Sequence, residues 1–258
     1  MSDPDRFLYK YRTIDEDNIN RARRIFTDNE LYFSSKNQFN DPFDCKFGYS
    51  FTATKPEIKK YFKAMLDRSR PDLNRRQKKR WIVEQMKTFN LNDPDLERMM
   101  IEGTDEIISG IGICSLTEVP DDILMWSHYA DSHKGFCIKL LDDEKERFIQ
   151  GTYQVSYSDE FPIVNPIRDD VDVRMNKTLL TKAKHWDYEK EWRTIDHEKG
   201  TGIKKFPPHL LVGVIFGCKM TENHKEKIRE WCADRGHSVT FYQAQEASHT
   251  YSLEITKV

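Results

Sequence analysis

The segment Cys114–Ile138 constrains the fold most, because it fits two strands, a short helix and a turn into twenty-five residues. Ile111–Leu116 is apolar and rich in strand-forming residues, which predicts the first strand. Asp121 or Asp122 can cap the following helix by accepting hydrogen bonds from its first free amides. Phe136–Ile138 then predicts the second strand.

The helix in this segment carries Trp126, His128 and Tyr129, and it is too short to bury all three side chains. We therefore expect some of them to face a cleft. His128 can act as an acid, a base or a hydrogen-bond donor beside Tyr129, or it can pack as a histidine in a satisfied network. His128 and His133 imitate a metal-binding pair, but their spacing crosses the end of the helix and offers no further ligand. We expect no metal there.

Length and composition exclude several classes of protein. A chain of 258 residues suits one large domain, or one domain carrying an insertion. Its formal charge of −2 gives no whole-chain attraction to nucleic acid or membranes. No apolar run approaches the roughly 20 residues that span a bilayer, and the first residues lack the apolar core of a signal peptide. The five cysteines form no Cys-x-x-Cys pair, which favours a reducing, cytoplasmic setting without structural zinc.

Strand and helix patterns are dispersed irregularly along the chain. Further strands are predicted at Phe7–Arg12, Leu31–Ser35, Gly151–Tyr157, Leu210–Phe216, Val239–Ala244 and Tyr251–Ile255. Further helices are predicted from Asp15 or Asp17 to about Asp28, at Asp142–Phe148, from Asp169 or Asp170 through Ala183, and at Thr221–Arg235. This mixture predicts a single α+β domain over residues 1–258, with a mixed, mainly antiparallel sheet and flanking helices.

Residues 54–109 form a helical insertion in this pattern. Lys55–Lys87 holds twelve Lys or Arg and four Asp or Glu, whereas Thr88–Ser109 holds one Arg and six acids. The basic part can lie on the phosphates of a nucleic acid. Equally, a run of charge is commonly a solvated helix face, and the aromatic residues here repeat at core spacing.

Phe39–Asp44 forms a tight polar turn between two phenylalanines, because Asn and Asp side chains bond nearby backbone and proline fixes the next φ. It can be a rigid loop pinned by its aromatic residues. Alternatively it is a cleft wall in which Asn40, Asp41 or Asp44 binds a substrate.

Tyr188–Arg193 is the sharpest chemical signal. If these residues are extended, Glu189, Glu191 and Arg193 project from one face, with the two carboxylates about 7 Å apart. Paired carboxylates can orient a sugar hydroxyl, stabilise a cationic sugar or accept a proton. The same pattern can also be an exposed strand with weak ion pairs. Dinucleotide-fold, P-loop, zinc-protease and serine-hydrolase motifs are absent from the sequence.

Four motifs in this order resemble those of a bacterial and phage family known only as a domain of unknown function. They are Leu8–Arg12, Phe39–Asp44, Met125–Ala130 with Gly135–Ile138, and Tyr188–Arg193. The resemblance covers most of the chain outside the helical insertion. It implies a family without implying an activity.

The chain is also similar, more distantly, to the ADP-ribosyltransferases. Those enzymes combine an early strand bearing an Arg or His that grips the cofactor, a second strand with Ser, Thr or Tyr, and a late Glu-x-Glu. Arg12, Ser34 or Ser35, and Glu189 with Glu191 occupy comparable places here. The likeness is at the level of the fold, and the late motif differs in preceding a tryptophan and an arginine.

The leading hypothesis is an NAD-dependent ADP-ribosyltransferase that acts on a macromolecule, as a toxin or phage-defence effector. In this hypothesis Glu191 stabilises the sugar cation, Glu189 orients the acceptor and His128 donates a hydrogen bond. Its expected cofactor contacts are Arg12, Ser34, Ser35, Trp126, Tyr129 and Arg193.

Two alternatives stay open. In the first, Asp41, Asp44 and Glu191 bind a divalent cation that cleaves nucleic acid. In the second, the chain is a non-enzymatic module that binds nucleic acid through the basic helices at 55–87.

Overall fold

The computed structural model describes residues 6–143, 145–146, 148 and 151–258, and these divide into two compact units. Unit 1 comprises the described residues of 1–40, 110–157 and 184–258. Unit 2 comprises residues 41–109 and 158–183. Unit 2 thus contains the helical segment expected at 54–109 together with the stretches 41–53 and 158–183.

Unit 1 is built on a sheet in which eight strands of the described chain run in the order β14-β13-β12-β5-β1-β4-β10-β6. In chain order they are β1 (Phe7–Arg12), β4 (Gly112–Thr117), β5 (Phe136–Leu141), β6 (Thr152–Gln154), β10 (Glu191–Asp196), β12 (Leu211–Phe216), β13 (Thr240–Glu246) and β14 (Leu253–Lys257). Only the β12–β13 pairing in this sheet is parallel. The predicted α+β class with a mixed, mainly antiparallel sheet is confirmed.

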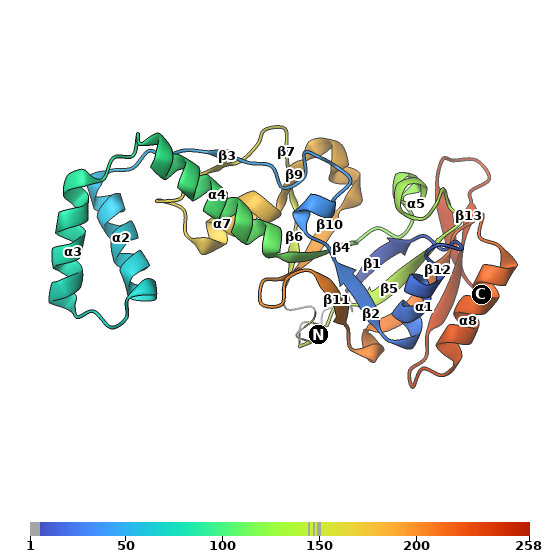
Figure 1. The fold of residues 1–258 in the computed structure, drawn as a ribbon. Coiled ribbons are helices and arrows are strands. Elements are labelled where there is room, and N and C mark those ends of the chain that lie inside the picture. The colour runs from blue at the N-terminus through green and yellow to red at the C-terminus, as the bar shows by residue number, and fades with distance from the viewer. Residues whose placement is uncertain (1–5, 144, 147, 149–150) are drawn as a thin grey trace, which may run out of the picture. The chain divides into compact units, whose positions relative to one another are not determined.

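The other described elements of unit 1 lie outside this sheet. They are α1 (Ile19–Thr27), β2 (Glu30–Phe33), η1 (Lys36–Gln38), α5 (Ile123–Tyr129), η2 (Lys184–Glu189), β11 (Gly202–Lys205), η3 (Pro208–Leu210) and α8 (Glu222–Ala233). Strand β2 pairs with β11 in a small sheet of its own. Figure 1 shows α1 and α8 side by side. Both helices bury apolar residues in one core cluster, which also holds Leu8 of β1. A second cluster joins α5 to Tyr11, which lies three residues after Leu8 on the same strand.

These two clusters lie on opposite faces of the sheet. Cα partners point their side chains to the same face, and successive residues on a strand alternate. Tyr9, Thr117 and Glu191 are partners across β1, β4 and β10, so they share one face. Tyr11 and Cys137 share it as well, and they pack in the cluster with α5. The face toward α5 is therefore the face that carries Glu191.

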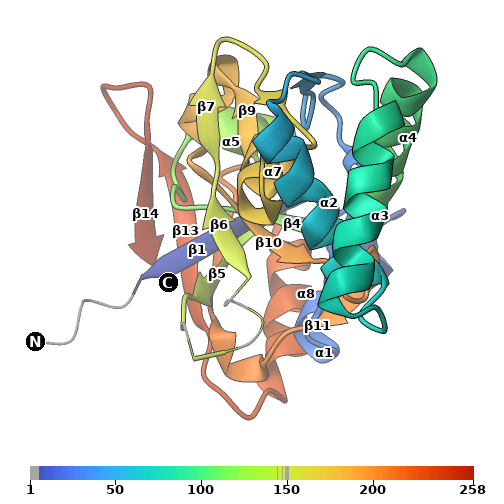
Figure 2. The ribbon, with the colours of Figure 1, turned by 90° about the vertical axis from the view of Figure 1, so that its left-hand side faces the viewer.

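Unit 2 is mainly helical. Its elements are β3 (Gly48–Tyr49), α2 (Lys55–Ser69), α3 (Arg75–Thr88), α4 (Pro94–Gly110), β8 (Ile163–Val164), α7 (Val171–Leu179) and β9 (Thr181–Ala183), while β7 (Ser156–Ser158) lies at the boundary of the two units. Figures 1 and 2 both show α2 and α3 side by side as a helical hairpin. Ile58, Phe62 and Leu66 of α2 pack in one cluster with Ile82 of α3. The helical spacing of the aromatic and aliphatic residues thus builds the core of this hairpin.

The structure corrects two predicted elements. The helix expected to run through Ala183 ends at Leu179, and Thr181–Ala183 forms the strand β9 instead. The strand expected at 151–157 is split into β6 and β7. Between them, the Val155 amide donates to the Glu191 carbonyl at 3.0 Å. The helix expected at 142–148 lies partly outside the described residues.

Two properties predicted from composition can also be compared with the structure. All five cysteines are free thiols. In the part of the chain that the structure describes, no helix combines the length and apolar character needed to cross a membrane.

Candidate active site

Helix α5 begins where the sequence predicts. Asp122 is its N-cap and accepts hydrogen bonds from the amides of Leu124 and Met125 at 2.8 and 2.9 Å. This cap orients the helix so that Met125 and Trp126 face the sheet while Ser127 and His128 are exposed. The short helix therefore has one buried face and one open face, as expected.

Trp126 belongs to the buried face. Its ring is fully buried, contacts Tyr11 edge-on at 5.1 Å between ring centroids, and donates its indole N–H to the Pro120 carbonyl at 2.9 Å. A ring with every surface packed offers no face on which a cofactor can stack. In this structure Trp126 is a core residue that packs against the sheet.

Tyr129 connects α5 to the carboxylate motif. Its hydroxyl donates to Glu189 Oε1 at 2.7 Å, although sixty residues separate the two in sequence. His128 lies at the exposed end of the same helix, with its ring about 6 Å from the rings of Tyr129 and Trp186, at 6.2 and 6.3 Å between centroids. Two predicted site residues that are distant in sequence, Tyr129 and Glu189, are thus brought together, and His128 lies beside Tyr129.

The expectation of an extended Tyr188–Arg193 is wrong at its first half. Residues 184–189 form the 3₁₀ helix η2, and Lys190 has a positive φ of 43° before β10 begins at Glu191. A left-handed residue breaks the strand alternation on which the equal spacing of the carboxylates depended. Glu189 consequently reaches Tyr129 from the end of η2, whereas Glu191 and Arg193 share a strand face.

Glu191 and Arg193 form a two-point ion pair inside unit 1. Arg193 Nε donates to Glu191 Oε1 at 2.9 Å, and Arg193 Nη2 donates to Oε2 at 3.1 Å. Both residues are buried, with 0% of Arg193 and 3% of Glu191 exposed. The guanidinium carbon also lies 5.2 Å from the centre of the Phe39 ring, which adds a cation–π contact. Removing two charges from water is costly, so the pair needs partners of this kind.

The backbone around the carboxylates is held by residues that the sequence did not single out. The Glu191 amide donates to the Tyr157 hydroxyl at 2.8 Å. The Thr117 hydroxyl donates to the Glu189 carbonyl. The only available signal was position, because Thr117 ends a predicted strand and Tyr157 lies on an alternating one. Their contacts span long sequence separations, which local patterns do not reveal.

Arg12 does not join this group. It is three residues from Tyr9 on β1, so alternation places it on the face opposite Glu191. Desolvation lowers the pKa of its guanidinium, and Arg21 of α1 lowers it further, while Cys114 opposes them. Arg21 belongs to the helix that covers that opposite face. The register thus places Arg12 and Glu191 on opposite faces of the sheet, and the role expected for Arg12 as a cofactor contact stays a prediction.

The serines of the second strand also have structural roles. Ser34 pairs through its backbone with Ile113, in hydrogen bonds of 2.9 and 2.8 Å. Ser35 is the N-cap of η1, and its amide donates to the Gln38 side chain at 3.0 Å. Neither observation assigns a cofactor contact to these two residues.

The residues of the Phe39–Asp44 turn have separate environments. Asn40 is exposed. Asp41 accepts a hydrogen bond from the Phe43 amide at 2.8 Å, which closes the turn. Asp44 lies 3.7 Å from the ammonium of Lys182, and both side chains are almost fully buried within unit 2. In this segment Asp41 holds the turn, Asn40 is accessible to solvent, and the charge of Asp44 is balanced by Lys182.

A metal site at the predicted acidic residues would have to displace two cations. Asp44 is paired with Lys182, and Glu191 is paired with Arg193.

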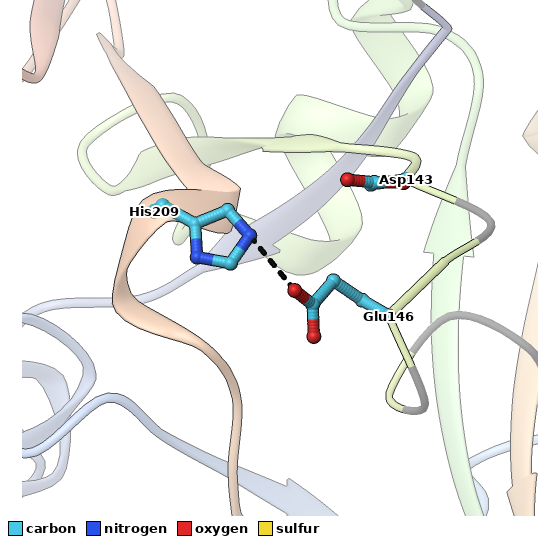
Figure 3. A group of neighbouring side chains, drawn as sticks. All are labelled: Asp143, Glu146 and His209. Atoms are coloured by element: carbon cyan, nitrogen blue, oxygen red, sulfur yellow. Dashed lines mark ion pairs between the residues drawn. The ribbon is translucent and has the colours of Figure 1, made fainter.

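Another group in unit 1 has spacing suited to a metal ion: ligand atoms of Asp143, Glu146 and His209 all lie within 4.8 Å of one another. Figure 3 shows the ion pair within this group, at 3.2 Å between His209 Nε2 and Glu146 Oε1. Acidic clusters of this kind are common without a metal, and Glu146 already pairs with His209.

One protein family matches part of this chain. Residues 125–194 match the family described as "Protein of unknown function (DUF2971)". This stretch is therefore similar to that family. It contains α5, the Tyr129–Glu189 pair and the Glu191–Arg193 pair, so the expected kinship with a domain-of-unknown-function family is confirmed over the residues that build the site. No curated protein and no solved structure matches the chain.

Proposed function

We propose that this protein is an enzyme that transfers ADP-ribose from NAD to a macromolecule, with Glu189 and Glu191 at its active site. The observation that supports the proposal is the burial of both carboxylates in one unit, where each accepts hydrogen bonds from a neighbouring side chain. Glu189 accepts a hydrogen bond from a phenol, whereas Glu191 binds a guanidinium. Buried charge of this kind opposes folding and recurs at functional sites. The two environments give the two acids different tasks.

In the proposed reaction, the bond between nicotinamide and the ribose carbon breaks, and its electron pair leaves with nicotinamide. Positive charge then develops on the sugar, and Glu191 stabilises it electrostatically. Arg193 fixes the orientation of this carboxylate through its two hydrogen bonds. The acceptor nucleophile forms the new bond to the ribose carbon, and its proton passes to Glu189, which Tyr129 orients. Arg12 and Trp126 have no part in this proposal.

The test is nicotinamide release from NAD, measured by mass spectrometry with the purified protein and a cell extract. Glu191→Gln keeps the shape of the side chain and should lower release by at least about 100-fold. Glu189→Gln should lower transfer to the extract more than hydrolysis by water, because the acceptor proton loses its base. Glu226→Gln, an exposed acid on α8, is the matched control and should have no effect. Full activity of Glu191→Gln would remove the proposal.

A second property, contact with nucleic acid through the α2–α3 hairpin, is favoured by its charge pairing. All four acids within 55–87 form ion pairs, with Lys78, Arg70, Lys87 and Arg168 as their partners. Nine further cations of this segment have no ion pair among the described residues, and all are exposed: Lys55, Lys59, Lys60, Lys63, Arg68, Arg75, Arg76, Lys79 and Arg80. We propose that this surface holds a nucleic acid, either as the acceptor or as a bound partner.

This contact predicts salt-dependent binding to a short duplex, measured by fluorescence anisotropy. Each phosphate contact contributes about 0.9 to the slope of log affinity against log salt. Lys59→Ala/Lys63→Ala should therefore reduce that slope by about 2. Lys227→Ala/Lys257→Ala removes the same charge from unit 1 and should leave the slope unchanged. Equal slopes for the two double variants would refute the assignment, whatever the outcome of the nicotinamide assay.

A further inference from the structure

A pocket of about 610 Å³ lies beside α5 in unit 1. One wall is the first half of α5 as far as Ser127, and another is the segment 246–253, which connects β13 to β14. His133, from the loop after α5, also lines the pocket. Neither Glu189 nor Glu191 belongs to the lining, so the two carboxylates of the proposed active site are not part of this pocket. Its volume falls within the range that small-molecule sites occupy.

A serine and a histidine meet in this pocket. Ser127 Oγ and His133 Nε2 lie 3.2 Å apart, which is within hydrogen-bonding distance. Ser127 is exposed and His133 is half-buried, and both line the pocket. The hydroxyl has a second acceptor in the Ile123 carbonyl at 2.9 Å, but a neutral amide carbonyl is too weak a base to remove a proton. Nε2 is therefore the group that can take the proton of Ser127 when the hydroxyl attacks a substrate.

The backbone is strained where it presents His133. Three successive residues, Asp131, Ser132 and His133, have positive φ angles of 46°, 51° and 71°. Such a run is unfavourable for residues that carry a side chain, and strain of this kind recurs at functional sites, where surrounding contacts enforce it. Here the His133 amide donates to the Trp126 carbonyl at 3.2 Å, and its carbonyl accepts from the Lys219 amide at 3.0 Å. The loop thus folds back on α5 and holds the histidine beside the serine.

The imidazole ring is supported by Trp126 and is neutral at pH 7. The two rings are nearly parallel, with 12° between planes and 6.4 Å between centroids. The Nδ1 of His133 is buried and has no hydrogen-bond partner among the described residues, so the arrangement is a dyad and not a triad. Desolvation and the positive charge of Lys219 lower the pKa of His133, while Glu246 opposes them. A neutral imidazole with its proton on Nδ1 leaves Nε2 able to act as a base.

The walls of the pocket select the kind of substrate. Ile123 and Leu124 are 36% and 43% exposed, and Tyr251 is fully exposed, so the lining presents apolar side chains that an acyl chain can cover. Lys219 also lines the pocket and supplies positive charge near the histidine. Positive charge there favours the negative charge that develops on a carbonyl oxygen under attack. An ester of an apolar carboxylic acid suits this combination.

We propose that Ser127 and His133 form a catalytic dyad that hydrolyses carboxylic esters. Ser127 Oγ forms a bond to the carbonyl carbon while its proton passes to His133 Nε2. The bond from that carbon to the alcohol oxygen breaks, and the alcohol leaves with the proton. Water then attacks the acyl-serine with His133 as the base, the acid is released, and the proton returns to Ser127. The proposal does not rest on the NAD-dependent reaction, because neither Glu189 nor Glu191 takes part in it.

The test uses the full chain and two probes, a fluorophosphonate that labels activated serines and p-nitrophenyl butyrate. The fluorophosphonate should leave an adduct that peptide mass spectrometry maps to Ser127, and the ester should release p-nitrophenol faster than in buffer. Ser127→Ala should abolish both reactions. His133→Asn removes the base but suits a left-handed backbone, and it should lower both rates by at least about 100-fold. Ser238→Ala removes an exposed serine outside the pocket and should change neither rate.

Three outcomes would overturn the proposal. They are ester hydrolysis no faster than in buffer, the absence of a fluorophosphonate adduct on Ser127, and equal rates for the wild-type protein and either dyad variant. The melting temperature of Ser127→Ala separates loss of chemistry from loss of fold. It should stay close to that of the wild type, because position 127 is exposed and alanine favours the helix. The adduct map is made on the wild-type protein, so it decides the question even if a variant unfolds.

Discussion

The buried Glu191–Arg193 pair makes a quantitative prediction about stability. Its two side chains are 4% and 0% exposed and meet at 2.9 Å. Arg193→Met preserves most of the side-chain volume and leaves the Glu191 carboxylate buried without the guanidinium. Breaking one half of such a pair costs about 3–5 kcal/mol, because the surviving charge stays desolvated. Loss of the cation–π contact with Phe39 adds about 1 kcal/mol.

The double variant Arg193→Met/Glu191→Gln removes both desolvation penalties together. It should be less unstable than Arg193→Met alone, with a coupling free energy of about 2–3 kcal/mol between the two positions. The measurement is urea unfolding followed by circular dichroism for wild type, both single variants and the double variant. Arg98→Met, which removes one partner of an exposed ion pair on α4, should cause no measurable change.

Two results would refute this reasoning. One is a free energy of unfolding for Arg193→Met within about 1 kcal/mol of the wild type, which would mean that the pair is solvated. The other is additivity of the two single variants, which would mean that the charges do not interact. In a domain of this size, about 3 kcal/mol corresponds to a fall of roughly 6–12 °C in melting temperature, so thermal scans provide a second readout.

Three further predictions follow from other contacts. A Cβ added at Gly217 would lie 2.1 Å from a backbone carbonyl oxygen, whereas a Cβ at Gly236 would have no atom within 4 Å. Gly217→Ala should therefore lower the free energy of unfolding by about 3 kcal/mol. Gly236→Ala should leave it unchanged. Burial lowers the pKa of Lys10 to about 8 from its ordinary 10.5. The unfolded chain therefore binds the extra proton between these values, stability rises with pH across this window, and Lys10→Met should remove that rise from urea titrations. Tyr129→Phe leaves Glu189 without its phenol and should cost about 2 kcal/mol in unfolding experiments.

Local patterns predicted the capped elements well, because a cap depends on neighbours in sequence. Asp122 caps α5 and Asp170 caps α7, both among the residues expected. The strand around β1 was equally clear from its alternation. These features need no knowledge of the rest of the chain, which is why the α+β class could be inferred.

The site was harder to predict, because its geometry depends on one backbone angle and on strand pairing. Nothing in the sequence marks Lys190 as left-handed, since lysine rarely adopts that conformation, yet this residue takes Glu189 off the strand. The face on which Arg12 lies is likewise fixed only by which residue of β4 pairs with Tyr9. The spacing of residues along the chain therefore identified Glu189 and Glu191, but it did not predict how their side chains are arranged in space.

The position of β1 in the sheet has a consequence for the order of folding. This strand is made first among the described strands, yet it lies between β5 and β4, more than a hundred residues later in the chain. During synthesis β1 cannot pair until β4 and β5 have been made. The α2–α3 hairpin, in contrast, can form through contacts between residues close in sequence. Closing such long loops is slow, so a nascent chain should show helical structure well before its sheet resists proteolysis.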